Sequence, residues 1–152
     1  MSRIPTPTFL IVFLIVIVDD RVLMIQEVLD GNPWHIPAGM VEPGENLLDG
    51  ARREALEEAG IVVELDGLLR VEQIHHKNGS MRLRYFFTAH PVDDSPPKQF
   101  GDEHSLRADW FTWEEVKQLP LRSDYILEIL EEVRNGVPLH PVSSIIYRDF
   151  RS

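Results

Sequence analysis

Residues 39–61 read GMVEPGENLLDGARREALEEAGI, and this stretch is the most informative part of the chain. The turn-forming pair Pro43 and Gly44 precedes a helix, which we predict to begin after Asn46 as its N-cap and to end at Gly60. The stretch places an unusual number of carboxylate side chains in and just before one short helix. The acidic residues that matter are Glu45, Glu54, Glu57 and Glu58.

A helical wheel places two of these carboxylates on the apolar face. With an advance of about 100° per residue, five residues form the stripe that should face the protein interior. These residues are Leu47, Leu48, Ala51, Ala55 and Ala59. Glu54 and Glu58 fall on or beside that stripe, where two carboxylates repel each other and resist desolvation. A divalent cation removes both objections, and Mg²⁺ takes oxygen ligands and is commonly shared with substrate phosphates.

The stretch resembles the Nudix box, G-x5-E-x7-R-E-U-x-E-E-x-G-U, in which U is an aliphatic residue. The matching residues are Gly39, Glu45, Arg53, Glu54, Glu57, Glu58, Gly60 and Ile61, while Ala55 stands where a larger aliphatic is usual. A solvated amphipathic helix with ion pairs such as Arg53–Glu57 would explain neither the two bracketing glycines nor the position of Glu58.

The resemblance implies a fold and an activity. It covers most of the chain and implies a MutT-like α/β protein, a Nudix-type α/β/α sandwich with a mixed β-sheet between helices. The implied activity is Mg²⁺-dependent hydrolysis of a nucleoside diphosphate linked to another group X. We expect Mg²⁺ as the cofactor, with Mn²⁺ able to replace it.

The resemblance also implies roles for individual residues. The metal ligands would be Glu54, Glu57 and Glu58, together with the backbone carbonyl of Ala38. Glu57 and Glu54 are both candidates for the base that accepts a proton from the attacking water. Arg53 and Glu45 have two possible roles: an ion pair that supports the loop, or direct contact of Glu45 with metal or substrate and of Arg53 with phosphate.

Residues outside the box extend the predicted site. Arg82 and Arg84 share one face of a predicted strand and suit phosphate oxygens, although a solvated strand face is the alternative. Many family members place a further carboxylate near the metals from the part of the chain that holds Glu103 here, as base or extra ligand. The alternative for Glu103 is a solvated loop tip. His35 lies just before the box, where it would either contact the substrate or pack.

Composition sets limits on the kind of protein. A chain of 152 residues forms one domain, residues 1–152, with a sizeable core. The net charge of −10 argues against nucleic acid as a partner, and the absence of cysteine excludes disulfides and a cysteine nucleophile. The apolar run 9–18 is too short to span a membrane and reads as a strand buried on both faces. We expect a cytoplasmic monomer or homodimer with a small nucleotide as its substrate and no membrane partner.

The other elements follow from periodicity and turn signals. Strands are predicted at residues 9–18, 22–27, 34–38, 61–65, 68–76, 81–90 and 106–111, and helices at 112–119 and 123–135. Asn78-Gly79 predicts a hairpin turn. The proline-containing residues 91–104 predict a mobile loop, and the tail from residue 137 should pack along the surface.

Two family motifs that this chain lacks bear on the choice of substrate. The region after the box has neither the proline of ADP-ribose hydrolases nor the tyrosine of dinucleoside polyphosphate hydrolases, which favours a nucleoside di- or triphosphate. The stretches LLRVEQ, MRLRYFFTA and SLRADW, with Pro120-Leu121-Arg122, resemble the branch that clears oxidised guanine diphosphates. An ADP-ribose or other nucleoside diphosphate-X hydrolase, and a nucleotide-sensing domain without catalysis, remain the alternatives.

Overall fold

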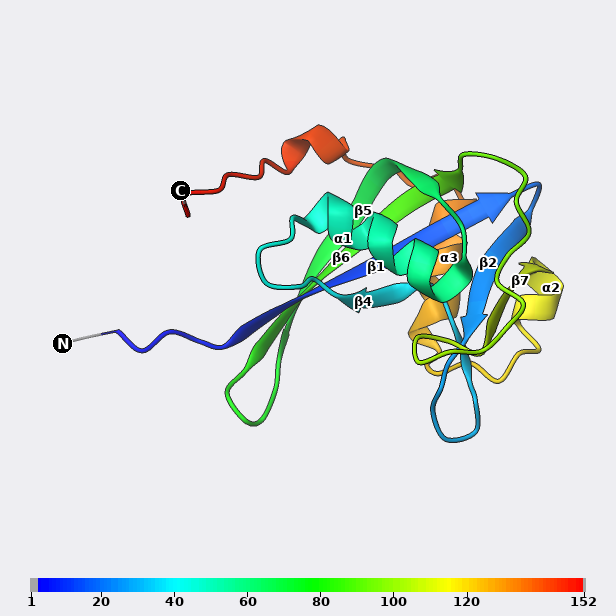
Figure 1. Cartoon of the computed structure of the whole chain (residues 1–152), viewed down its shortest axis with the longest axis horizontal. Coiled ribbons are helices and arrows are strands. Elements are labelled where there is room, and N and C mark those ends of the chain that lie inside the picture. Colours follow the sequence, from blue (N-terminus) through cyan, green and yellow to red (C-terminus); the bar gives the residue numbers. More distant parts are fainter. Residues whose placement is uncertain (1–2, 152) are drawn as a thin grey trace.

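The computed structural model describes residues 3–151 (Figure 1). This part of the chain holds seven strands, namely β1 Thr8–Val18, β2 Arg21–Gln26, β3 Trp34–His35, β4 Ala38–Met40, β5 Val63–His75, β6 Met81–Pro91 and β7 Arg107–Thr112. Its helical segments are α1 Leu47–Glu54, the π-helical turn η1 Ala55–Ala59, α2 Trp113–Val116, α3 Tyr125–Arg134 and the 3₁₀ turn η2 Val142–Ser144.

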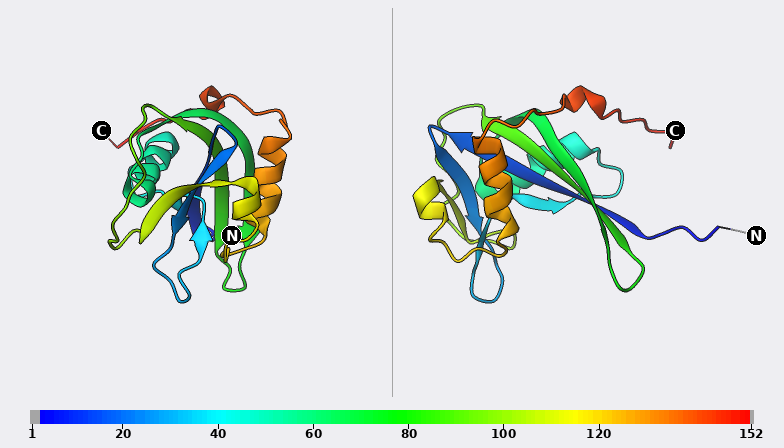
Figure 2. Two further views of the ribbon diagram at one scale, coloured as in Figure 1. Left: turned by 90° about the vertical axis from the view of Figure 1, so that its right-hand side faces the viewer. Right: turned by 180° about the vertical axis from the view of Figure 1, so that it is seen from behind.

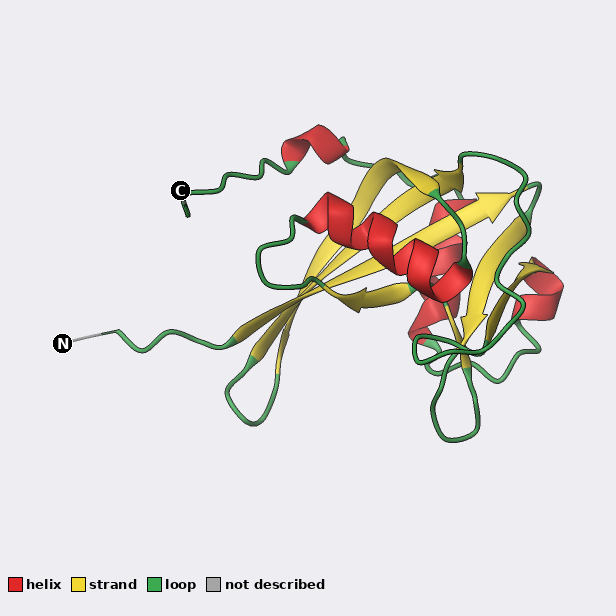
Figure 3. Ribbon diagram, viewed as in Figure 1, coloured by secondary structure: helices red, strands yellow, loops and turns green. Residues whose placement is uncertain are grey.

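The sheet is mixed and centres on β1, as the ribbon in Figure 3 shows. The strand order is β3-β2-β1-β6-β5, with β4 paired to β1 and β7 paired to β2. The β1–β6 pair is parallel, and the other strand pairs are antiparallel. Because β4 pairs with the middle of β1, the start of the 39–61 stretch is fixed to the centre of the sheet.

Strand β1 is buried on both faces, and its alternating side chains divide the core into two layers. Val12 and Leu14 pack on the side that holds α1 and η1, whereas Phe13 and Ile15 pack on the side that holds α3. Figure 2 shows the two helical layers on opposite faces of the sheet. The predicted α/β/α sandwich with a mixed sheet is therefore confirmed.

The helix of the 39–61 stretch begins as the sequence predicts. The Asn46 side chain accepts a hydrogen bond from the backbone N–H of Asp49 at 2.8 Å, which satisfies one free donor of the first turn. Ala51, Ala55 and Ala59 are fully buried against the sheet. Gly60 ends the helical segment with φ of 69°, a left-handed conformation that favours glycine.

The same helix differs from the prediction in its last turn. It is α-helical only as far as Glu54 and continues as a π-helical turn from Ala55 to Ala59. A π-turn is wider than an α-turn and is common at functional sites. Glu57 and Glu58 therefore lie on an irregular turn, which the regular 100° spacing of a helical wheel does not describe.

Three further predicted boundaries are corrected. The predicted strand 34–38 is split into β3 and β4 by Ile36 and Pro37. The two predicted strands 61–65 and 68–76 form the single strand β5, which passes Gly67 with register shifts against β6 instead of turning. The predicted helix at 112–119 has the expected Thr112 cap but ends at Val116.

The remaining features agree with the sequence. Asn78-Gly79 forms the turn between β5 and β6, with Gly79 at φ of 85°. The tail returns to the sheet through a bridge between Leu68 and His140, and Val142 packs on the core. Among residues 3–151, no helix is both long enough and apolar enough to cross a membrane.

Candidate functional site

The carboxylates of Glu54 and Glu58 lie beneath the chain segment that leads from β3 into β4. Each of the two residues is only 8% exposed. Glu58 Oε1 accepts a hydrogen bond from the backbone N–H of Ala38 at 2.7 Å. The carboxyl of Glu54 lies against Gly39, where an added Cβ would come within 2.1 Å of Glu54 Cδ. Both carboxylates are buried, as their predicted place on or beside the apolar face implies, although Glu58 lies on the π-helical turn.

Arg53 binds the acidic residues around it. Its guanidinium donates to both carboxylate oxygens of Glu45, at 2.7 and 2.9 Å. Arg53 Nη1 bonds to Glu54 at 2.9 Å and to Glu57 at 3.0 Å, and Nη2 donates to the carbonyl of Met40 at 2.9 Å. This bidentate geometry links Arg53 to the loop before the helix, as one of the two predicted roles of the pair requires.

The electrostatics of the site follow from burial and from Arg53. Burial raises the pKa of Glu54 above its usual value and raises that of Glu58 well above it. The hydrogen bonds from Arg53 lower the pKa of Glu45. Charging two buried carboxylates costs free energy, which Arg53 offsets at Glu54 and which a bound divalent cation would offset at both.

The side chains of Glu54, Glu57 and Glu58 supply the oxygen donors that a hard divalent cation binds. Within residues 3–151, no three His, Asp or Glu side chains converge as closely as a bound metal ion requires. The group that bridges Glu54 and Glu57 is Arg53 Nη1. The donor set nevertheless consists of carboxylate oxygens beside the backbone of Ala38, which is the kind of oxygen site that Mg²⁺ prefers.

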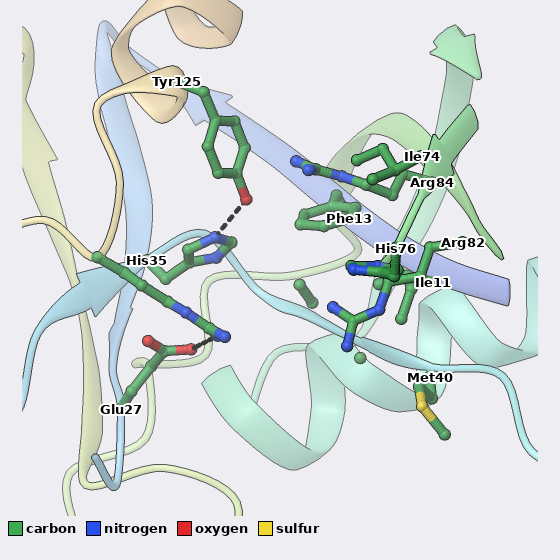
Figure 4. A pocket seen from close by; sticks show the side chains of 13 residues that line it. Ile11, Phe13, Glu27, His35, Met40, Ile74, His76, Arg82, Arg84 and Tyr125 are labelled. Atoms are coloured by element: carbon green, nitrogen blue, oxygen red, sulfur yellow. Dashed lines mark hydrogen bonds and ion pairs between the residues drawn. The ribbon is translucent and has the colours of Figure 1, made fainter. Parts of the chain in front are cut away.

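A cavity of about 460 Å³ lies next to the chain segment of Ala38 and Gly39, and Figure 4 shows the side chains that line it. Ala38 and Gly39, which contact Glu58 and Glu54, form part of its wall. The other lining residues come from several elements and are Ile11, Phe13, Glu27, His35, Met40, Ile74, His76, Arg82, Arg84, Arg122 and Tyr125. A ligand in this cavity would therefore contact aromatic, basic and acidic side chains and would lie against Ala38 and Gly39, which contact the two carboxylates.

Arg82 and Arg84 both line this cavity, as their shared strand face predicts. The guanidinium of Arg84 lies over the rings of Phe13 and Tyr125, at 4.9 and 4.5 Å from the ring centroids. Among the described residues, the buried side-chain atoms without a hydrogen-bond partner include Nε and Nη2 of Arg84 and Oε2 of Glu27. Such atoms in a cavity wall are suited to a polar ligand.

His35 is packed within the wall of the cavity. It is 3% exposed, and its Nδ1 lies 2.6 Å from the carbonyl of Ile36, so Nδ1 carries the hydrogen. Nε2 is then the acceptor for the Tyr125 hydroxyl at 2.7 Å. Burial lowers the pKa of His35 to about 4, so the ring is neutral at physiological pH.

Glu103, in the loop before β7, lies at the surface, whereas Glu54 and Glu58 are buried. The side chain of Glu103 is exposed and lies 3.4 Å from His104 Nε2, and Nδ1 of His104 lies 3.5 Å from Glu57. In this conformation, Glu103 is separated from the carboxylates by His104. The loop is tied to the helix by hydrogen bonds from Lys98 and Ser105, although the sequence predicted a mobile segment.

Several residues of the site gave no signal in the sequence. Glu27, Arg122 and Tyr125 meet in the cavity from three separate parts of the chain, and Glu27 pairs with Arg122 at 2.8 Å. The stretch Pro120-Leu121-Arg122 suggested a substrate branch but not a contact. Contacts between residues so far apart in the chain cannot be predicted from a single sequence, because they depend on how α3 packs against the sheet.

The comparisons agree with this geometry. The NUDIX domain family model matches residues 8–132. Over 115 residues, the chain is 36% identical to the 8-oxo-dGDP phosphatase NUDT18 of Mus musculus. The matched residues make up 74% of this chain and 34% of that protein. It is 29% identical over 120 residues to the phosphatase NudJ of Escherichia coli O1:K1 / APEC, with 78% of each chain covered.

A solved structure shows the same fold. The NUDIX hydrolase from Nitrosomonas europaea superimposes with a TM-score of 0.81 at 27% identity, covering 95% of this chain and 99% of that one. The chain spans about a third of the length of the NUDT18 relatives. The match over residues 8–132, the glutamate-lined helix and the shared sandwich lead to one conclusion: the chain belongs to the NUDIX domain family.

Proposed function

We propose that this protein is a Mg²⁺-dependent hydrolase that cleaves a diphosphate linkage in a nucleoside di- or triphosphate. The proposal rests on one observation: the same two residues contact the buried carboxylates and line the cavity. Ala38 contacts Glu58, Gly39 contacts Glu54, and both residues line the cavity. A nucleoside in the cavity would thus place its phosphates beside the acidic residues.

Glu54, Glu57 and Glu58 with the Ala38 carbonyl would hold the metal, and Mn²⁺ would serve in place of Mg²⁺. When bound, Mg²⁺ supplies positive charge at the diphosphate and makes the attacking water more acidic. Glu57 and Glu54 are the candidates for the base that accepts the proton of that water, and Glu103 would act there only after a movement of its loop. Arg53 orients Glu45, Glu54 and Glu57 through its hydrogen bonds.

The side chains of the cavity would bind the rest of the substrate. Arg82 and Arg84 would donate to phosphate or base oxygens. Within the described part of the chain, Nε and Nη2 of Arg84 have no hydrogen-bond partner, although Nε lies 3.6 Å from Glu72 Oε1, and this lack of partners supports the role. The Oε2 atom of Glu27 would accept a hydrogen bond from a base. Glu45 stays a candidate for substrate contact, and both of its oxygens also receive hydrogen bonds from Arg53.

Oxidised guanine nucleotides are the substrates that we favour. The similarity to NUDT18, named an 8-oxo-dGDP phosphatase, supports them. The alternatives are ADP-ribose or another nucleoside diphosphate-X, or nucleotide sensing without hydrolysis. The retention of all four box glutamates favours catalysis over sensing. The cytoplasmic location and the monomeric or homodimeric state stay predictions.

A nucleotide panel tests the proposal. Phosphate and pyrophosphate release would be measured with 8-oxo-dGDP, 8-oxo-dGTP, ADP-ribose, a dinucleoside polyphosphate and NADH, each with Mg²⁺ and with EDTA. We expect hydrolysis only with Mg²⁺ and the highest kcat/KM on an oxidised guanine nucleotide. Tight binding without hydrolysis of any nucleotide would establish the sensing alternative, and a best kcat/KM on ADP-ribose would reassign the substrate.

A further inference from the structure

Lys98 is a buried lysine that contacts the end of the glutamate-bearing helix. Its side chain is 4% exposed, although it carries a charged ammonium. The ammonium donates to the backbone carbonyl of Glu57 at 3.1 Å, to Asp102 Oδ1 at 2.5 Å and to the hydroxyl of Ser105 at 3.0 Å. A buried ammonium is costly unless its donors are satisfied, and here each of its three donors has an acceptor.

The same loop completes the hydrogen bonding of the last helical turn. The final carbonyls of a helix have no partner within the helix itself. Here the carbonyl of Glu57 accepts from the Lys98 ammonium, that of Glu58 from the Ser105 hydroxyl at 2.6 Å, and that of Ala59 from the backbone N–H of Lys98 at 2.8 Å. Three consecutive carbonyls of η1 are therefore bonded to residues 98–105, which lie outside the 39–61 stretch.

The turn η1 and the loop of residues 98–105 approach each other closely at Gly60. Gly60 lets the loop approach, because a Cβ at that position would lie 3.2 Å from Lys98 Cβ and from its backbone nitrogen. Asp102 closes the loop on itself by accepting from the backbone N–H groups of His104 and Ser105, at 2.8 and 3.2 Å. The loop is therefore a bonded unit with a defined position on the helix.

We infer that Lys98 and Ser105 are positioning residues for the metal-binding carboxylates of Glu57 and Glu58. The inference rests on the proposed function, since it assumes that these two glutamates bind the metal. Each hydrogen bond holds the backbone of the residue whose side chain would be a ligand. The turn η1 is a single π-helical turn, and three of its five carbonyls are bonded to partners outside the helix. Loss of these partners would misdirect both carboxylates at once.

Metal binding gives the direct test. Mn²⁺ would be titrated against the purified protein without nucleotide and the free ion followed by electron paramagnetic resonance. Lys98→Met removes the ammonium but keeps an unbranched side chain, and Ser105→Ala removes one hydroxyl. The matched control is Lys117→Met, because Lys117 lies just after α2, is partly exposed and, among residues 3–151, forms its one side-chain ion pair with Glu114.

We expect Lys98→Met and Ser105→Ala each to weaken Mn²⁺ binding at least about tenfold, equivalent to about 1.4 kcal/mol. The Lys117→Met control should bind Mn²⁺ like the parent. The double variant of Lys98 and Ser105 should lose less than the sum of the two single losses, because both residues act on one turn. With 8-oxo-dGDP, kcat at low Mg²⁺ should fall and recover partly at high Mg²⁺, while KM for the nucleotide stays the same.

The outcomes separate this inference from the proposed function. Circular dichroism melting selects a temperature at which every variant is folded. Folded Lys98→Met and Ser105→Ala variants with parental Mn²⁺ affinity would overturn the positioning role. If Lys98→Met does not fold, Ser105→Ala alone decides the question. A parent protein that binds Mn²⁺ but hydrolyses no nucleotide would refute the proposed function while leaving the positioning role intact.

Discussion

The carboxyl group of Glu54 occupies the space that a side chain at residue 39 would fill. A Cβ on Gly39 would lie 2.1 Å from Glu54 Cδ and also 2.1 Å from its Oε1, far inside van der Waals contact. The glycine at the start of the 39–61 stretch is therefore required by a carboxylate fifteen positions further along the chain. The requirement is steric, because Gly39 has no positive φ.

The first prediction follows from this contact. Gly39→Ala should displace the flexible end of Glu54 and leave the backbone in place. We expect kcat to fall at least about a hundredfold, equivalent to about 2.7 kcal/mol, with a melting temperature within a few degrees of the parent. The measurement is steady-state kinetics beside thermal unfolding. The Gly39→Ala, Glu54→Gln double variant should be little worse than either single one, and additive losses would show that Gly39 acts in another way.

A second prediction concerns Glu58. Glu58→Gln should lower turnover roughly 10³-fold or more, because it removes the charge of a proposed metal ligand. The fold should remain, since an amide oxygen can still accept the hydrogen bond from Ala38. The comparison is kcat at saturating Mg²⁺ for parent and variant. A near-normal kcat would remove Glu58 from the metal site.

Arg53 gives a third prediction. Arg53→Ala removes the partner of Glu45, Glu54 and Glu57 together, so repulsion among these carboxylates is no longer balanced. We expect the free energy of unfolding to fall by about 2 kcal/mol and kcat to fall with it. Urea unfolding and kinetics on the same variant provide the measurement. A raised KM with unchanged stability would instead indicate that Arg53 contacts the phosphates.

A fourth prediction uses the pH dependence of stability. The pKa of His35 is lowered from 6.5 to about 4 by burial, so between these values the unfolded chain binds a proton that the folded chain does not. Stability should therefore fall as the pH decreases from about 6.5 to about 4, with a slope from this residue of up to about 1.4 kcal/mol per pH unit. His35→Gln should lose this component. Urea unfolding at several pH values measures it, and equal slopes in both proteins would contradict the assignment.

The fifth prediction concerns the loop before β7. Glu103 is exposed and reaches the carboxylates only through His104, so Glu103→Gln should leave kcat within about twofold of the parent, or about 0.4 kcal/mol. The measurement is kcat at saturating Mg²⁺ and nucleotide. A fall of tenfold or more would show that the loop moves to bring Glu103 to the reacting phosphates, as the family resemblance suggested.

The sequence predicted the parts of the fold that depend on local pattern. The run of β1 is apolar on both faces because it lies between two helical layers, and that property is visible in ten consecutive residues. The Asn46 cap, the Asn78-Gly79 turn and the position of Glu58 on an apolar arc are also local. The predicted break at residues 66–67 was wrong, because a strand that bends with register shifts carries the same glycine signal as a turn.

The family, the buried strand β1 and the acidic helix could be predicted from the sequence, because each is recorded by residues close together in the chain. The partners of those residues became visible only in the folded protein. Folding brings Lys98 and Ser105 to the carbonyls of Glu57 and Glu58, and it brings Tyr125 to His35. These contacts depend on how separate elements pack, and the free energy of packing is shared among many residues, so no short motif records it.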